Sequence, residues 1–244
     1  MAELVFYYGT MASSKTANAL MKRFQYISKG LEVLLIKPQI ENRAGEKTVS
    51  SRVGIEAEAD LVIEKDKDIL IYWHHYLEDH EIPAAIIIDE AQFLTTKQIE
   101  DLKIIAEEVN IPIYCYGLRT DFKSKLFEGS KRLFELASRV FEIDSICEIC
   151  GKPAIINAKY SKGKLVTAGA QIDIGGDEKY KAICYECYIR AKEQAELIPG
   201  ENYWPGCGTS VTELAQMEQH PRTTSKRAAT EYLDSLLEKG KNNE

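Results

Sequence analysis

Short apolar runs, rich in branched or aromatic residues, recur through the first 143 residues and are separated by longer amphipathic stretches. These runs are LVFYYG at 4–9, VLLIK at 33–37, AAIIIDE at 84–90, IPIYCYGL at 111–118 and RVFEI at 139–143. Strands that are covered on both faces have this continuous apolar pattern, so each run is predicted to be a central strand. Their alternation with helical stretches predicts an α/β fold with a parallel sheet and crossover helices.

Two stretches have apolar residues at helical spacing, with polar residues opposite. In residues 14–29 the apolar positions are Ala17, Leu20, Met21 and Phe24, and in residues 97–109 they are Ile99, Leu102, Ile105 and Ala106. Both stretches are predicted to be helices that bury these positions. EADLVIEKD at 58–66 and DILIYWHHYL at 68–77 favour a further strand and helix, which the pattern does not order in the fold.

The residue pattern of the sequence changes near Ser145, where short β-prone segments are interspersed with small residues. IINAKY and KLVTAG flank Ser161, Lys162 and Gly163, which predicts a hairpin. We therefore predict an α/β domain over residues 1–143, a second domain over 144–192 and a C-terminal extension over 193–244. Residues 226–244 favour a final amphipathic helix with a polar tail, and disorder of the extension stays an open alternative.

Charge and composition limit the classes of partner. The 244 residues include 31 basic and 38 acidic ones, a net charge of -7 that argues against a nucleic-acid partner. A small anionic substrate is still possible, because a local site can be basic on an acidic protein. No run has the length of a membrane span, and the first residues lack the features of a secretory signal, so we expect a cytoplasmic protein without a membrane partner.

The segment GTMASSKT, residues 9–16, lies between a predicted strand and a predicted helix. It resembles a phosphate-binding loop, in which backbone N–H groups and the helix dipole hold phosphate. Lys15 is expected to reach the terminal phosphates, and the Thr16 hydroxyl is expected to bind magnesium. The alternative is an ordinary turn with Ser13 or Ser14 as helix N-cap.

Ser14 stands where the common motif has glycine. A side chain in a left-handed backbone conformation costs about 1 to 2 kcal/mol, so the loop is predicted to be weakened or reshaped rather than lost.

Asp89 and Glu90 end the apolar run at 84–90. A carboxylate at the carboxyl end of a central strand beside a phosphate loop is where the magnesium of a nucleotide is held, a role predicted for Asp89. Adjacent strand residues point to opposite sides, so Glu90 is expected to face away from Asp89 and to be free for a different task, of which general base toward an acceptor hydroxyl is one. The alternative is that two acids merely end a strand.

Four of the six cysteines form two Cys-x-x-Cys pairs, Cys147 with Cys150 and Cys184 with Cys187. Four thiolates suit one closed, structural zinc site, with the 33 intervening residues looping out. A redox pair or reduced structural thiols are the alternatives. Cys115 is predicted to be a core residue and Cys207 a surface thiol.

The segment AGAQIDIGGDEKY lies between the hairpin and the second cysteine pair. Gly175 and Gly176 allow unusual backbone angles, and bare backbone there could pair with a flat polar ring while Tyr180 closes over it. An ordinary Gly-Gly turn with a packed tyrosine explains the same residues.

In this order, GTMASSKT, DEAQF, YGLRTDF, the two cysteine pairs and IGGDEKY resemble the motifs of the type II (cytosolic-type) thymidine kinase family. The resemblance covers roughly residues 4 to 190 and lies in the order and combination of the motifs. It implies a P-loop (RecA-like) domain followed by a small zinc-ribbon domain with a lasso loop. It also implies transfer of the γ-phosphoryl of ATP to the 5′-hydroxyl of thymidine or deoxyuridine, giving dTMP for DNA synthesis.

The resemblance also implies site residues. Glu90 corresponds to the catalytic base. The nucleotide-binding residues are expected to be Gly9, Thr10, Met11, Ala12, Ser13, Ser14, Lys15, Thr16, Asp89, Glu90, Ala91 and Gln92. The nucleoside is expected to contact Met11, Phe93, Leu118, Phe122, Tyr180 and a lasso of Gln171, Ile172, Asp173, Ile174 and Gly175. Arg43 and Arg52 match basic positions over the phosphates, and a homotetramer inhibited by dTTP is implied as well.

Two departures put ATP affinity and rate in question: Ser14 replaces the family's glycine, and Ala12 replaces an often aromatic residue. A catalytically weakened nucleotide-binding regulator of the same fold is therefore an alternative. A nucleic-acid ATPase with a zinc ribbon is another, which the negative charge and the lack of a basic stripe oppose.

Overall fold

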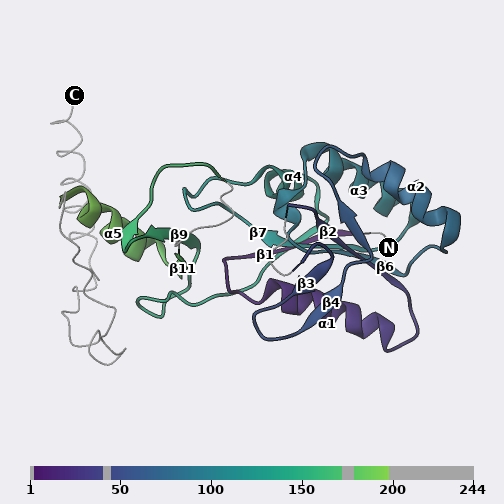
Figure 1. Cartoon of the computed structure of the whole chain (residues 1–244), viewed down its shortest axis with the longest axis horizontal. Coiled ribbons are helices and arrows are strands. Elements are labelled where there is room, and N and C mark those ends of the chain that lie inside the picture. The colour runs from purple at the N-terminus through teal and green to yellow at the C-terminus, as the bar shows by residue number, and fades with distance from the viewer. Residues whose placement is uncertain (1–2, 41–44, 172–178, 198–244) are drawn as a thin grey trace, which may run out of the picture. The chain divides into compact units, whose positions relative to one another are not determined.

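In the computed structural model of the chain, residues 3–40, 45–171 and 179–197 are described, and they belong to one compact unit. Six parallel strands form its central sheet in the order β5-β2-β6-β7-β1-β8 (Figure 1). The strands are β1 (Leu4–Gly9), β2 (Val33–Pro38), β5 (Leu61–Ile63), β6 (Ala85–Ile88), β7 (Ile113–Leu118) and β8 (Arg139–Glu142). The predicted parallel α/β fold is thus confirmed.

Helices cover both faces of this sheet (Figure 1). They are α1 (Lys15–Ile27), α2 (Ile69–Asp79), the short η1 (Ala91–Phe93), α3 (Thr96–Val109) and α4 (Glu128–Leu136). Alternate residues of the inner strands belong to two separate hydrophobic cores: Ile86 and Ile88 pack with α3, whereas Ala85 and Ile87 pack with α1. This double coverage explains why the inner strands are apolar at every position.

Two predictions of burial are wrong. The run at 139–143 forms β8, but β8 pairs only with β1 at the sheet edge, and all four of its residues are exposed in the described structure. In α1 the predicted apolar face is only half buried: Ala17 and Leu20 are covered, whereas Met21 and Phe24 are 55% and 69% exposed. The apolar positions of α3, by contrast, are buried as predicted.

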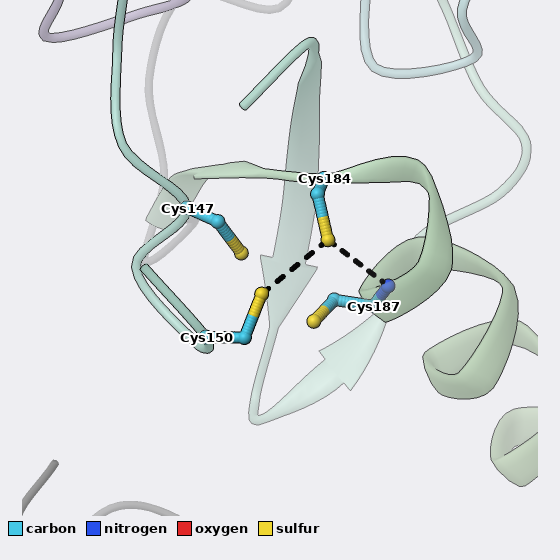
Figure 2. Close-up of side chains that lie close together, drawn as sticks. All are labelled: Cys147, Cys150, Cys184 and Cys187. Carbon is cyan, nitrogen blue, oxygen red and sulfur yellow. Dashed lines mark hydrogen bonds between the residues drawn. The ribbon is translucent and has the colours of Figure 1, made fainter. Parts of the chain in front are cut away.

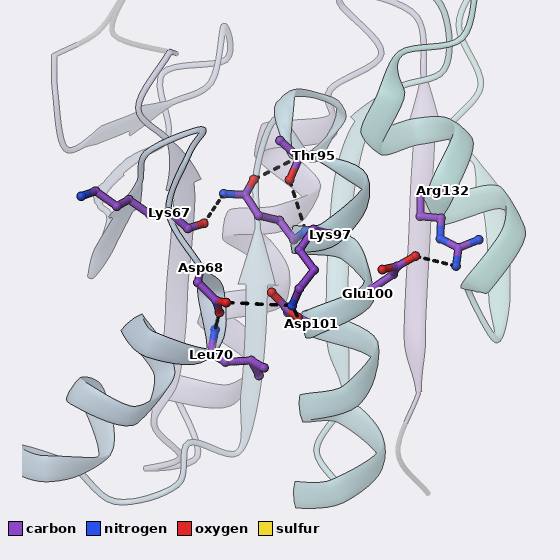
Figure 3. A network of polar contacts seen from close by, with 9 residues as sticks. Lys67, Asp68, Leu70, Thr95, Lys97, Glu100, Asp101 and Arg132 are labelled. Carbon is purple, nitrogen blue, oxygen red and sulfur yellow. Dashed lines mark hydrogen bonds and ion pairs between the residues drawn. The ribbon is translucent and has the colours of Figure 1, made fainter.

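A network of polar contacts at the start of α3 fixes the loop before α2 (Figure 3). Gln98, 1% exposed, donates to the carbonyls of Glu64 and Lys67 at 2.9 Å and accepts from Thr95 N at 3.0 Å. Lys97 pairs with the fully buried Asp101. The network ties the segment after β5 to the helix that follows β6.

A three-stranded antiparallel sheet follows, in the order β10-β9-β11. Its elements are β9 (Ile156–Ser161), β10 (Lys164–Leu165) and β11 (Lys179–Ile183), followed by α5 (Tyr185–Leu197). Lys162 and Gly163 form the predicted hairpin turn with φ of 48° and 78°, as two-residue turns of this kind require. We call residues 145–171 and 179–197 the cysteine module; α5 continues past the expected boundary at residue 192.

A small hairpin of β3 (Thr48–Ser50) and β4 (Glu56–Glu58) completes the described elements. The predicted helix at 226–244 lies outside the described residues. None of the helices in the described part of the chain combines the length and apolar character that a membrane crossing requires.

Candidate active site

The predicted phosphate loop joins β1 to α1. Gly9 begins the loop where a Cβ atom would lie 2.7 Å from the carbonyl oxygen of Ile143, so only glycine fits. The Lys15 side chain is 8% exposed and its Nζ donates to the carbonyl of Thr10 at 2.6 Å. The lysine is therefore held inside the curve of the loop.

Two residues of the loop have left-handed backbones without being glycine. Ala12 and Ser14 both have φ of 62°. A left-handed conformation at a residue with a side chain costs about 1 to 2 kcal/mol relative to a relaxed backbone. The sequence predicts this strain for Ser14. Ser14 occupies the N-cap position of α1, but its side chain makes no capping hydrogen bond, so the ordinary capped turn is not what the structure has.

The Thr16 hydroxyl donates to Oδ2 of Asp89 at 2.9 Å. Thr16 lies in the first turn of α1 and Asp89 directly follows β6, although β7 separates β6 from β1 in the sheet. Burial raises the pKa of Asp89, and the nearby Glu90 carboxylate raises it further, against the hydrogen bond from Thr16 and the charge of Lys15. Asp89 is buried and Glu90 is half-buried, and two neighbouring acids of this kind suit a divalent cation, which would stabilise both charges.

The predicted reason for the orientation of Glu90 is wrong. β6 ends at Ile88, so strand alternation does not apply to Asp89 and Glu90. Glu90 instead has a left-handed backbone with φ of 52°, and its carboxylate accepts a hydrogen bond from the Gln92 amide. A strained residue at this point is a common feature of functional sites.

Gln92, 2% exposed, connects this acid to the end of β7. Its Oε1 accepts from the backbone N–H of Leu118 at 2.9 Å while its Nε2 donates to Glu90. The neighbouring Gly117 has no space for a side chain, because a Cβ atom would lie 2.7 Å from Oε1 of Gln92. Ala91, a predicted nucleotide-binding residue, is fully buried and its side chain belongs to the hydrophobic core.

A cavity of about 750 Å³ opens beside Gln92. Phe93 and Phe127 meet edge to face on its wall, with ring centroids 5.8 Å apart. Gln171 lines the cavity and donates to Asp121 at 3.1 Å. Two of the predicted nucleoside contacts, Phe93 and Gln171, are thus brought together.

The other predicted nucleoside contacts are more dispersed. Leu118 and Phe122 are 6% and 1% exposed, Met11 is half-buried, and none of the three lines the cavity. Phe122 packs under the ammonium of Lys159, 5.0 Å from the ring centroid. Tyr180 lies in β11, in register with Lys159, rather than in a loop. Ile172, Asp173, Ile174 and Gly175 lie outside the described residues.

Cys147, Cys150, Cys184 and Cys187 converge in one cluster, as predicted (Figure 2). Their four Sγ atoms lie within 4.8 Å of one another, and the backbone N–H of Cys187 points to Sγ of Cys184 at 3.5 Å. Four thiolates around one point fit the tetrahedral coordination of zinc.

The remaining predictions have mixed outcomes. Cys115 is buried in β7 as predicted, and burial raises the pKa of its thiol, which keeps it unreactive. Arg52 is exposed in the turn between β3 and β4. Arg43 and Cys207 lie outside the described residues.

Three residues near the site were not predicted from the sequence. Phe127 precedes α4 in an aromatic cluster that periodicity alone does not place. Asp121 accepts from the backbone N–H groups of Lys123 and Lys125, and Asn157 contacts the phosphate loop. Asp121 belongs to the quoted YGLRTDF motif, whereas nothing in the sequence indicates a role for Asn157.

The sequence model of the family described as "Thymidine kinase" matches residues 2–188. The chain belongs to the thymidine kinase family. Proteins named thymidine kinase from Zymomonas mobilis and Lactococcus lactis are 40% and 39% identical to it over 192 and 190 residues. Each alignment covers 78% of this chain and 97% and 98% of those proteins. A thymidine kinase from Streptococcus gordonii is 40% identical over 190 residues.

Proposed function

We propose that this member of the thymidine kinase family transfers the γ-phosphoryl of ATP to the 5′-hydroxyl of thymidine or deoxyuridine. The observation that carries the proposal is the hydrogen bond from Thr16 to Asp89, close to Lys15 and Glu90, with the Glu90 partner Gln92 on the wall of a cavity. Phosphoryl transfer needs positioning, charge neutralisation and one carboxylate near the nucleophile, and these residues supply each requirement. The product dTMP would serve pyrimidine salvage.

The phosphate loop binds ATP in this proposal, with residues 9–16 around the phosphates. Lys15 exchanges its contact with the Thr10 carbonyl for the terminal phosphates. Thr16 and Asp89 hold Mg²⁺, a hard cation that takes oxygen ligands and neutralises phosphate charge when bound. The partly buried contact between the oxygen atoms of these two residues supports that assignment.

Glu90 accepts the proton of the 5′-hydroxyl. Its left-handed backbone and the hydrogen bond from Gln92 fix the carboxylate in one orientation, which a general base requires. Gln92 contacts protein atoms on both sides, which favours a role in holding Glu90 over direct contact with the nucleotide.

The nucleoside occupies the cavity with its base against Phe93 and Phe127. Aromatic walls suit a flat pyrimidine, and the Gln171 amide adds a polar group at the rim. Met11, Leu118, Phe122, Tyr180 and the lasso at 171–175 complete this site in the proposal. The described geometry of Phe93 and Gln171 supports it.

The four cysteines hold a structural Zn²⁺ that fixes the two ends of the lasso segment. The cluster has no oxygen or nitrogen ligand among the described residues, which favours a closed site over a catalytic one. Zinc held by four cysteine thiolates is typical of proteins in a reducing compartment, and the proposal places the chain in the cytoplasm.

The proposal keeps the division between residues 143 and 144 and extends the second domain from the expected residue 192 to Leu197, where α5 ends. A homotetramer and inhibition by dTTP are extended to this chain from the family resemblance. No specific observation favours the alternative of a catalytically weakened regulator.

A comparison of the wild-type chain with Glu90→Gln tests the assignment of the base. The wild-type chain should convert thymidine, ATP and Mg²⁺ into dTMP and ADP. Glu90→Gln should bind both substrates with wild-type affinity by calorimetry and turn over at least 100-fold more slowly. Equal turnover by the two proteins would show that another group takes the proton.

A further inference from the structure

The Asn157 side chain joins the cysteine module to the phosphate loop. Asn157 lies on β9 and is 2% exposed. Its Oδ1 accepts the backbone N–H of Met11 at 2.7 Å, and its Nδ2 donates to the carbonyl of Thr120 at 3.0 Å. The amide accepts from one backbone group and donates to another, and neither an ionised acid nor an aliphatic residue of this size makes both contacts.

The hydrogen bond to Met11 lies next to the strained residues of the phosphate loop. Met11 directly precedes Ala12, and Ser14 follows two residues later, both with φ of 62°. Strained residues keep such a conformation only when their surroundings fix it, and neither Ala12 nor Ser14 is buried. Packing around these side chains therefore does not hold them in place.

A second contact acts on the same part of the loop. The hydroxyls of Thr10 and Ser145 are hydrogen-bonded, and the Ser145 hydroxyl also donates to the carbonyl of Ala154 at 3.3 Å. Thr10 in turn supplies the carbonyl that receives Lys15. Two hydrogen bonds, Thr10 to Ser145 and Met11 to Asn157, thus attach the first half of the loop to residues that follow the six-stranded sheet.

We propose that Asn157 is a positioning residue that holds the phosphate loop, which lacks the usual glycine, in its nucleotide-binding conformation. The inference rests on the proposed function, since it assumes that this loop binds ATP. Asn157 acts through Met11 N–H and touches neither ATP nor the reacting atoms. Its place on β9, in register with Ala182 two residues before Cys184, ties the loop to the strand pair that leads into the cysteine cluster.

The test is calorimetric titration with ATP and Mg²⁺, without nucleoside, of the full-length, zinc-loaded chain. Asn157→Leu keeps the size of the side chain and removes both hydrogen bonds, and it should weaken ATP binding about tenfold or more. Arg119→Met is the matched control, because it removes a contact between the same two regions, Arg119 to the Ile155 carbonyl at 3.2 Å, away from Met11. The control should stay within about twofold of the wild-type affinity.

Relief of the backbone strain should rescue the variant. Ser14→Gly should restore a substantial part of the ATP affinity in the Asn157→Leu background and change it less in the wild-type background. This coupling separates a hold on the loop from general loosening, which glycine would not correct. Additive effects of the two substitutions would contradict the proposal.

Other outcomes are equally decisive. Wild-type affinity in Asn157→Leu, or equal losses in Asn157→Leu and Arg119→Met, would overturn the inference and leave the proposed function intact. Failure of the wild-type chain to bind ATP would contradict the proposed function itself. Should Asn157→Leu fail to fold, amide exchange in the nucleotide-free wild-type chain decides: Met11 N–H should be protected, and fast exchange would overturn the inference.

Discussion

Gln92 donates a hydrogen bond to the carboxylate of Glu90, while its carbonyl oxygen accepts from the backbone of Leu118 at 2.9 Å. One buried side chain thereby sets the direction of the acid and the end of a neighbouring strand. Glu90 is the proposed base, and removal of Gln92, which donates to it, should lower the rate because small displacements of a base are costly.

Gln92→Leu should lower kcat by about 10- to 100-fold, with a smaller change in the KM for ATP. The matched control is Gln98→Leu, because Gln98 is equally buried but bonds to Thr95 and the segment 64–67. It should lose about 1 to 3 kcal/mol of unfolding free energy and keep kcat within about twofold. Equal losses of kcat in both variants would contradict the role of Gln92.

Ser14→Gly should raise the unfolding free energy of the nucleotide-free chain by up to about 1 kcal/mol, because glycine adopts φ of 62° without strain. Ser28→Gly is the control, since Ser28 at the end of α1 has φ of -62° and offers no strain to relieve. Chemical denaturation of the two variants measures the difference. A loss of stability on Ser14→Gly would show that the left-handed serine is not strained.

Asp89→Asn should stabilise the nucleotide-free chain while it abolishes turnover. Burial and the Glu90 charge raise the pKa of Asp89, so its ionised form is unfavourable in the empty site, and a neutral amide removes that cost. Asp101→Asn is the contrasting variant, because Asp101 is buried against Lys97 and its removal should destabilise the chain. Thermal unfolding at neutral pH without Mg²⁺ compares the two, and destabilisation by Asp89→Asn would contradict the account.

Cys184→Ser should lose the metal, because Cys184 supplies one of the four clustered Sγ atoms. Metal analysis of the purified chain should find about one zinc per chain in the wild type and much less in the variant. Cys115→Ala is the control: this cysteine is buried in β7, away from the cluster, and the variant should keep its zinc. Wild-type protein with four free thiols and no metal would refute the zinc site.

The sequence predicted the parts of the fold that depend on local pattern. The continuous apolar runs of β2 and β6 are read correctly because both faces of these strands are covered. The same rule fails for β8, whose apolar residues lie at an exposed sheet edge, since edge position depends on strand order and not on composition. Exposure of Phe24 on α1 likewise follows from which residues the sheet covers.

In the candidate site, too, the features that depend on local sequence were predicted and those that depend on distant contacts were not. Short motifs predicted two groups of residues: Lys15, Thr16 and Asp89 in one, and the four cysteines in the other. Each motif has the spacing that its own ligand chemistry requires. The orientation of Glu90 was missed, since it depends on a strained backbone and a distant strand end. Asn157 was missed because its partner Met11 is 146 positions away in the chain, a pairing that only the folded structure reveals.

The most direct test of the central claim is transfer of the label from γ-³²P-labelled ATP to thymidine by the wild-type chain with Mg²⁺. The account predicts labelled dTMP with the phosphoryl group on the 5′-oxygen, and loss of that product in Glu90→Gln. ATP binding without any labelled nucleotide product, or label transferred equally well by Glu90→Gln, would contradict it.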